Sequence, residues 1–173
     1  NHSIEKIDLE NAFVDDENSE TFRALCESLR GNTTLRYLNV ANNDVSLDGV
    51  CATALKLDTM SLEKLVLNDN TVTSCVIVAL AQGLRGPCTL KELSLKTCAL
   101  GDTDLLKLGE ALTSNVSLEV LDVRENICSR NGASHFFELL PQMKGLKAVF
   151  GITADVVAST EMVGRALVDG LRE

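Results

Sequence analysis

The sequence predicts an α/β solenoid in which short parallel strands line the concave side of a curved horseshoe and helices line its convex side. Three observations predict this fold: an apolar segment that recurs about every 28 residues, a change of hydrophobic periodicity within each unit, and an unusual composition. The 173 residues include 28 leucines but only five phenylalanines, one tyrosine and no tryptophan. A core of leucines rather than aromatic rings is typical of many similar layers, and we expect about six repeats.

The predicted strands follow the pattern L-x-x-L-x-[LV]-x-x-N. Successive copies begin 31, 27, 28, 28 and 28 residues apart, a regularity that indicates one structural unit per period. The clearest copies begin at Leu35, Leu62, Leu90 and Leu118, and weaker copies begin at Ile4 and Leu146.

The side chain at one position, at the end of each strand segment, is expected to form hydrogen bonds with the backbone of the loop that follows. This position contains Asn43, Asn70 and Asn126, and it contains Cys98 in the segment between the last two. An Asn side chain can both donate and accept hydrogen bonds, so it can satisfy backbone groups where no regular ladder exists. We expect Cys98 to occupy this position as a small, weakly polar substitute.

Between the strand segments the hydrophobic period changes from two residues to about 3.6, which predicts helices. A single strand–helix unit cannot cover its own apolar face, so the units must stack with parallel strands on one side and helices on the other. Matching inward positions in three units hold Ile77, Leu80, Ala81 and Leu84, then Leu105, Leu108, Gly109 and Leu112, then Ala133, Phe136, Phe137 and Leu140. Related faces occur at Phe22, Leu25, Cys26 and Leu29, at Val50, Ala54 and Leu57, and at Gly164, Leu167, Val168 and Leu171.

These units resemble leucine-rich repeats of the ribonuclease-inhibitor-like class. Residues 84–100, LRGPCTLKELSLKTCAL, are especially similar to the Cys-type unit of ribonuclease inhibitor and the NOD-like receptors, and Asn-type units flank them. The resemblance covers nearly the whole chain and implies a leucine-rich-repeat solenoid. It does not choose a function, because the same class includes the Ran GTPase-activating protein and tropomodulin.

Both ends of the chain fall in the same phase of the repeat. The stretch from Asn1 to Ile4 aligns with residues 32–35, and the stretch from Leu171 to Glu173 aligns with residues 29–31. Because solenoids need capping units, we expect residues 1–173 to form a single leucine-rich repeat domain that is a fragment of a longer protein. Further repeats or other domains are expected to flank it.

The composition argues against two classes of partner. A formal net charge of −9 disfavours sequence-independent binding to nucleic acid and docking on an anionic membrane. The most apolar run, residues 75–81, is far too short to span a bilayer. The six cysteines form no C-x-x-C pair and follow no signal peptide, so we expect reduced thiols in a cytoplasmic or, alternatively, nuclear protein.

No catalytic residue, cofactor or metal site is predicted. The only histidines, His2 and His135, are not at metal-ligand spacing from a cysteine, and His135 is expected on the outward face of its helix. No Gly-rich phosphate loop, H-E-x-x-H or G-x-S-x-G motif is present. The Asn-x-Ser/Thr triplets at Asn1, Asn32 and Asn115 share one repeat position, the turn from helix to strand, so the repeat itself explains them.

Alternate strand residues are expected to face the concave surface and to form three columns across the strands. Interface hot spots favour Tyr and Arg. The alternative is that these columns are a solvated face and that the contact surface lies outside this chain. The columns are Lys6, Tyr37, Lys64, Glu92, Val120 and Ala148; Asp8, Asn39, Val66, Ser94, Asp122 and Phe150; and Glu10, Ala41, Asn68, Lys96 and Arg124. From them we select as candidate partner-binding residues Tyr37, Val66, Lys96, Asp122, Arg124 and Phe150.

These observations favour a non-catalytic protein–protein interaction module, a scaffold that binds a protein partner through its leucine-rich repeat surface. They do not identify the partner. The Cys-type unit also supports an alternative, the ligand-sensing and autoregulatory region of a NOD-like receptor, for which an upstream nucleotide-binding domain would be diagnostic. A GTPase-activating function is a weaker alternative, because no polar catalytic residue is identifiable on a loop at the repeat edge. An actin-capping role like that of tropomodulin is weaker still.

Overall fold

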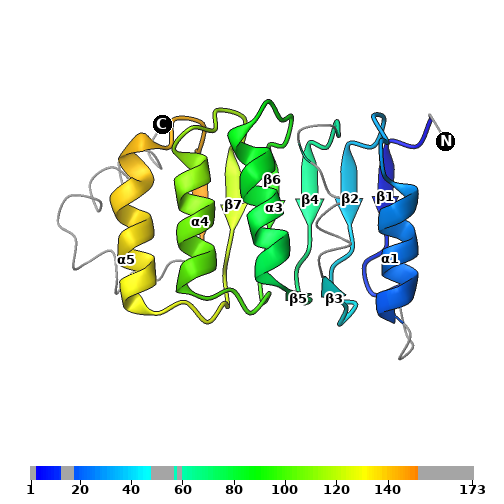
Figure 1. Cartoon of the computed structure of the whole chain (residues 1–173), viewed down its shortest axis with the longest axis horizontal. Coiled ribbons are helices and arrows are strands. Elements are labelled where there is room, and N and C mark those ends of the chain that lie inside the picture. Colours follow the sequence, from blue (N-terminus) through cyan, green and yellow to red (C-terminus); the bar gives the residue numbers. More distant parts are fainter. Residues whose placement is uncertain (1–2, 13–17, 48–56, 58–59, 152–173) are drawn as a thin grey trace.

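In a computed structural model of the chain, parallel strands form one layer and helices form another. The structure describes residues 3–12, 18–47, 57 and 60–151. Figure 1 looks onto the helices, with the strands behind them and the units following one another in chain order from the N-terminus. The strands are β1 (Lys6–Asp8), β2 (Tyr37–Asn39), β3 (Ser46–Leu47), β4 (Lys64–Val66), β5 (Thr71–Val72), β6 (Glu92–Ser94), β7 (Val120–Asp122) and β8 (Ala148–Phe150). The helices are α1 (Asn18–Ser28), α3 (Ser74–Arg85), α4 (Asp102–Leu112), α5 (Arg130–Leu139) and the 3₁₀ helix η1 (Leu140–Gln142).

The main sheet has the order β1-β2-β4-β6-β7-β8, and all of its neighbouring strands are parallel. Its register aligns Tyr37 with Lys6 and Lys64, and it aligns Asp122 with Ser94 and Phe150. The first two predicted columns are therefore confirmed, as is the α/β solenoid. The number of repeats stays a prediction, because the helical positions expected at residues 50–54 and 164–171 lie outside the described residues.

Leucine side chains fill the space between the two layers. The strand residues Leu38, Leu65, Leu93 and Leu121 are all at most 1% exposed, and the predicted inward positions of α3 and α4 are buried as well. Burying one such side chain contributes about 1.5–3 kcal/mol, so the repeated leucines account for most of the driving force that stacks the units. Gly109 packs against Phe136 of the next helix, which leaves little room for a larger side chain.

Two inward helical positions differ from the prediction, and one of them, Leu25 of α1, is half-buried rather than buried. Leu140 is only half-buried, and it belongs to η1 rather than to α5. Pro141 follows it and has no backbone N–H to continue the α-helical hydrogen bonds, so the chain tightens into a 3₁₀ turn at this point. The regular 3.6-residue face therefore ends one turn earlier than the sequence pattern indicates.

The predicted ladder at the strand ends is confirmed, and we call its members Asn43, Asn70, Cys98 and Asn126 the rung residues. The Asn70 Nδ2 donates to the carbonyl oxygens of Val40, Leu67 and Asn68 at 2.9, 3.1 and 3.0 Å, and its Oδ1 accepts from the Val45 N–H at 3.1 Å. Each Asn rung thus ties its own loop to the loop before it.

Cys98 fills its rung with a weaker set of bonds. Its Sγ donates to the carbonyl oxygens of Leu67 and Lys96 at 3.3 and 3.4 Å. The Val72 N–H of the preceding loop is bound by the Cys98 backbone carbonyl at 3.3 Å instead of by a side chain. The thiol therefore supplies the donor function of the Asn rung without its acceptor function.

The backbone turns into each loop through a left-handed residue just before the rung. This position has φ between 52° and 57° at Asn42, Asp69, Thr97 and Glu125, and Asn11 in the first unit has φ 53°. Asn and Asp tolerate this conformation, whereas a β-branched residue such as Thr97 is unusual there. Just beyond the rungs, β3 and β5 pair in parallel as a short second sheet, which the sequence pattern did not predict.

Candidate binding surface

The three predicted columns lie on the side of the main sheet away from the helices, and we call this side the open face. The open face carries a shallow groove of about 400 Å³ that crosses the strands from β2 to β8. Five of the six predicted binding residues line it. The residues that line it are Tyr37, Asn39, Lys64, Leu65, Val66, Asn68, Glu92, Leu93, Ser94, Val120, Asp122, Arg124 and Phe150.

Lys96 is the predicted binding residue that does not line the groove. Its ammonium pairs with the Glu125 carboxylate at 3.2 Å, in the loop that follows β7. Whether any of the six residues contacts a partner stays a prediction.

At one end of the groove, Asp122, Arg124 and Phe150 form a compact cluster. The Arg124 guanidinium donates to the Asp122 carboxylate from Nε at 3.0 and 3.1 Å and from Nη2 at 2.7 Å. The same guanidinium lies 5.7 Å from the centre of the Phe150 ring, within the range of a cation–π contact. Gly151 follows with φ +103°, and a Cβ there would overlap the Arg124 backbone, so this strand end approaches β7 closely.

The Asp122 carboxylate stays ionised in this cluster. Burial acts to raise its pKa, but hydrogen bonds from the Arg124 side chain and backbone N–H, together with the charges of Arg124 and Lys96, outweigh burial and lower that pKa below its ordinary value. The hydrogen bond from Arg124 to Asp122 in turn raises the pKa of the guanidinium. The pair therefore fixes the Arg124 side chain in one geometry, although the side chain is 53% exposed.

At the other end of the groove, Tyr37 has similar surroundings. The Lys6 ammonium lies 4.6 Å from the centre of the Tyr37 ring, and the same ammonium is 3.6 Å from the Asp8 carboxylate. The Tyr37 hydroxyl donates to the same carboxylate oxygen, Asp8 Oδ2, at 3.5 Å. Each end of the groove thus has an aromatic ring, a cation over the ring and a carboxylate that binds the cation.

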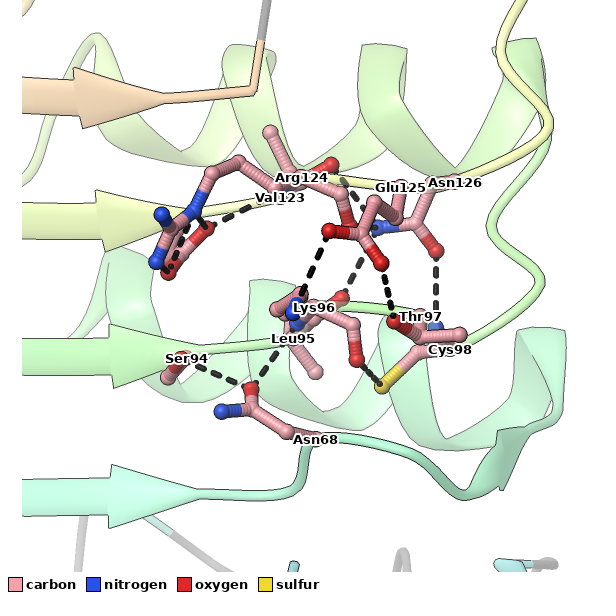
Figure 2. A network of polar contacts seen from close by, with 11 residues as sticks. Asn68, Ser94, Leu95, Lys96, Thr97, Cys98, Val123, Arg124, Glu125 and Asn126 are labelled. Carbon is pink, nitrogen blue, oxygen red and sulfur yellow. Dashed lines mark hydrogen bonds and ion pairs between the residues drawn. The ribbon is translucent and has the colours of Figure 1, made fainter.

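The middle of the groove contains a polar network that the sequence analysis did not single out. The Asn68 Oδ1 accepts from the Ser94 hydroxyl at 2.7 Å and from the Lys96 backbone N–H at 2.9 Å. Figure 2 shows Asn68 beside Ser94 and Lys96, with no contact drawn to its side-chain nitrogen. Asn68 was visible in the sequence as a member of the third column, but only the side-chain positions in the structure show that it faces Ser94.

The cations of the open face are paired with carboxylates. Besides the pairs at the two ends, Lys64 lies 2.5 Å from Glu92 on the neighbouring strand, and Lys96 pairs with Glu125. Within the three columns the cations Lys6, Lys64, Lys96 and Arg124 are matched in number by the carboxylates Asp8, Glu10, Glu92 and Asp122. The charges of the three columns therefore sum to zero, and the charged residues that line the groove pair with one another, Lys64 with Glu92 and Arg124 with Asp122. The chain as a whole has a net charge of −9.

A further column, which the sequence analysis did not recognise, precedes the strands and alternates in charge. The Glu63 carboxylate binds Arg36 at 3.1 Å and Lys91 at 2.9 Å, and Glu119 binds Lys147 at 2.9 Å. The hydrogen bond from Lys91 lowers the pKa of Glu63, and the same bond raises the pKa of Lys91. The signal was the alternation of sign at one repeat position, Glu5, Arg36, Glu63, Lys91, Glu119 and Lys147.

The asparagines of two glycosylation-like triplets serve the fold, as predicted. Asn115 is buried, with 5% of its surface exposed. Its side-chain nitrogen donates to the Leu84 carbonyl at 2.7 Å, and its side-chain oxygen accepts from the Leu118 N–H at 2.7 Å. Asn32 likewise accepts from the Leu35 N–H at 2.8 Å. Asn1 lies outside the described residues.

Cys75, Cys88, Cys98 and Cys128 are free thiols, and most of the described cysteines are integrated into the repeat. Burial raises the pKa of Cys98 to about 12 and that of Cys128 to about 11, so both stay protonated at neutral pH. Cys26 is fully buried in the core, and the Cys88 sulfur lies 3.1 Å from the Ser117 hydroxyl. Thiolate chemistry is therefore disfavoured at Cys98 and Cys128.

Neither a metal site nor a membrane span is found in the described part of the chain. No group of three or more His, Cys, Asp or Glu side chains there could hold a metal ion. His135 is exposed on α5, as predicted. No described helix is both long and apolar enough to cross a bilayer.

Comparison with known proteins identifies similar repeats in larger molecules. A family model described as Leucine Rich repeat matches residues 31–52 and 86–109. A Protein phosphatase 1 regulatory subunit 37 homolog of Caenorhabditis elegans is 30% identical over 139 residues, which are 80% of this chain and 14% of that protein. The human NACHT, LRR and PYD domains-containing proteins 2 and 3 are 34% and 33% identical over 70% and 75% of this chain, but over only 12% and 13% of their own lengths.

A solved structure is similar over nearly the whole chain. The actin-binding site 2 of leiomodin-1 superposes with a TM-score of 0.61 and covers 98% of this chain and 82% of that structure. The two sequences are 17% identical, so this likeness shows the fold alone.

Proposed function

Because this chain is a leucine-rich repeat protein, we propose that it is a non-catalytic interaction module that binds a protein partner through the open face of its sheet. The groove on the open face carries this proposal. The groove combines half-buried apolar side chains with an Arg and two aromatic rings, the residue types that dominate interface energetics. The names of the relatives, which include a phosphatase regulatory subunit, support a role in binding rather than in catalysis.

The chemistry of the groove also supports a non-catalytic role. The Ser94 hydroxyl donates to the side-chain oxygen of Asn68, and an amide oxygen cannot act as the general base that a serine nucleophile needs. The Asp122 carboxylate is bound by Arg124 on both of its oxygens, so it is a poor proton acceptor. Binding therefore accounts for these residues better than catalysis does.

A second candidate function is suggested by the human relatives. NACHT, LRR and PYD domains-containing proteins 2 and 3 match this chain at 34% and 33% identity. In this alternative, the chain is the ligand-sensing and autoregulatory repeat region of a receptor of that type. A nucleotide-binding domain with a P-loop in the same gene product would favour this alternative over an independent scaffold.

Affinity capture tests the proposed binding face. The double variant Tyr37→Ala/Arg124→Ala removes one anchor from each end of the groove, and both side chains are exposed enough to leave the core unchanged. Proteins captured from a lysate by the wild type should be retained at least about tenfold less well by this variant. The matched control is Val116→Ala/Ile127→Ala, which removes two side chains that are 77% and 74% exposed and lie outside the groove.

Two results would count against the proposal. Equal capture by the wild type and by the groove variant would place binding elsewhere on the molecule. Loss of capture with the control variant alone would assign binding to the edges of the repeats.

We also propose that the protein acts in the cytoplasm or nucleus. The free thiols at Cys75, Cys88, Cys98 and Cys128 support a reducing compartment. Fractionation of cells that express a tagged chain tests this, and secretion into the medium would contradict it.

A further inference from the structure

We propose that the groove binds an extended, uncharged segment of the partner, with one apolar side chain against Tyr37 and another against Phe150. This inference rests on the proposed binding function and specifies the chemistry of the partner. It is carried by three features of the open face: the matched ends of the groove, the pairing of its charges, and one amide donor in its middle.

The two aromatic rings are suited to act as anchors because both are held in place. Phe150 is 47% exposed, and the Arg124 guanidinium that covers part of its ring is fixed by Asp122. Tyr37 is half-buried under the Lys6 ammonium and is tied through its hydroxyl to Asp8. Rings that are already ordered lose little conformational entropy when a partner covers them, which favours binding at these positions.

The spacing of the rings sets the length of the segment. Tyr37 lies on β2 and Phe150 on β8, and four steps of the sheet separate these strands. At about 4.8 Å per step the rings lie roughly 19 Å apart, and an extended chain covers that span in about six residues. Val66 and Val120 lie between the rings and provide apolar contact along the way.

The charge pairing argues for an uncharged segment. Arg124, Lys64 and Lys96 each have a carboxylate partner within 3.2 Å. A charged side chain that entered the groove would lose hydration without finding an unpaired opposite charge. An apolar or neutral polar segment avoids this penalty, so the neutral open face matches a neutral ligand.

The side-chain nitrogen of Asn68 supplies a polar contact in the middle of the groove. Its oxygen is already bound by Ser94 and by the Lys96 backbone, and this holds the amide plane in place. In the described part of the chain the hydrogen bonds of the Asn68 side chain are made by its oxygen, so its Nδ2 is available to a backbone carbonyl of the segment. A neutral donor of this kind is consistent with recognition of an extended backbone.

The test is selection of a phage-displayed library of random peptides against the purified chain. Enriched peptides should carry no net charge and two apolar residues about six positions apart. Their affinity for the chain, measured by fluorescence anisotropy, should change less than about twofold between low and high salt, because no unpaired charges are involved. Tyr37→Ala and Phe150→Ala should each weaken binding about tenfold, and Asn68→Ala should weaken it less.

The control variant is Ile127→Ala, since Ile127 is 74% exposed and lies outside the groove. Enriched peptides that compete for the groove but are charged, strongly salt-sensitive or dependent on only one ring would overturn this inference and leave the proposed function intact. Peptides that bind equally well to the Tyr37→Ala and Phe150→Ala variants would overturn both. An absence of any enriched peptide would also contradict the inference.

Discussion

The rung residues and the open face use polar side chains in opposite ways. The side chain of a rung residue such as Asn70 is buried and bonds to backbone atoms of its own loop and of the loop before it. The polar side chains of the open face bond mainly to one another, and Arg124 with Asp122 is the clearest pair. A rung residue is therefore coupled to the fold, whereas an open-face residue can change with little effect on the backbone.

The contrast is sharpest between Asn68 and Asn70, which are two residues apart in one loop. Asn70 is 4% exposed and makes four hydrogen bonds to backbone groups. Asn68 faces the groove and accepts two hydrogen bonds through its oxygen. The same residue type thus serves stability at one position and is available for recognition at the other, and the direction of the side chain decides which.

Asn70→Ala is expected to have the largest effect on stability. It removes the acceptor of the buried Val45 N–H, and an orphaned buried group of this kind costs about 1–3 kcal/mol. The carbonyls of Val40, Leu67 and Asn68 each lose one hydrogen bond but keep another partner, so we expect a total loss of about 3 kcal/mol. Urea denaturation followed by circular dichroism measures it. The matched control, Asn68→Ala, should cost about 1 kcal/mol because its partners can bond to water. If both substitutions cost the same, the distinction between rung and open face is wrong.

Cys98→Ala should have a smaller effect than Asn70→Ala. The thiol makes only two long hydrogen bonds to backbone carbonyls, so we expect a loss of about 1 kcal/mol. Because burial raises the pKa of Cys98 to about 12, its contribution is fully present below the ordinary thiol pKa and decreases as the pH rises above about 9. Denaturation curves of wild type and variant should therefore converge in alkaline solution. A cost as large as that of Asn70→Ala would show that the two rungs are equivalent.

Asp122→Asn should have the smallest effect of the three. Its carboxylate binds an Arg124 side chain that is 53% exposed, so solvent screens the pair and we expect a loss of about 1 kcal/mol or less. The pKa of Asp122 is lowered in the folded state, so the stabilisation is present above about pH 4 and is lost as the pH falls through the folded-state pKa. Thermal melts of the wild type and of Asp122→Asn at neutral and acidic pH measure the difference in stability between them. A stability difference that stays the same at low pH contradicts this account.

The sequence predicted the repeat positions better than it predicted the contacts between them. Leu65 and Leu93 could be placed in the core, and Asn70 and Cys98 on the ladder, because each position recurs at a fixed period. The side-chain pairs were not predicted. The bond between Asn68 and Ser94, for example, requires that two side chains in different columns turn toward each other, and the repeat period does not specify side-chain rotamers.

The sequence by itself determined the fold, because the periodic leucines can be buried only if the units stack. It also placed Tyr37, Val66, Asp122, Arg124 and Phe150 on one face of the sheet, since side chains alternate along a strand. Only the tertiary structure decided that the two aromatic rings mark the ends of one groove and that every cation of this face has a carboxylate partner in the described residues. Such pairings depend on distances of a few ångströms between side chains of different units, and a repeat pattern does not specify them.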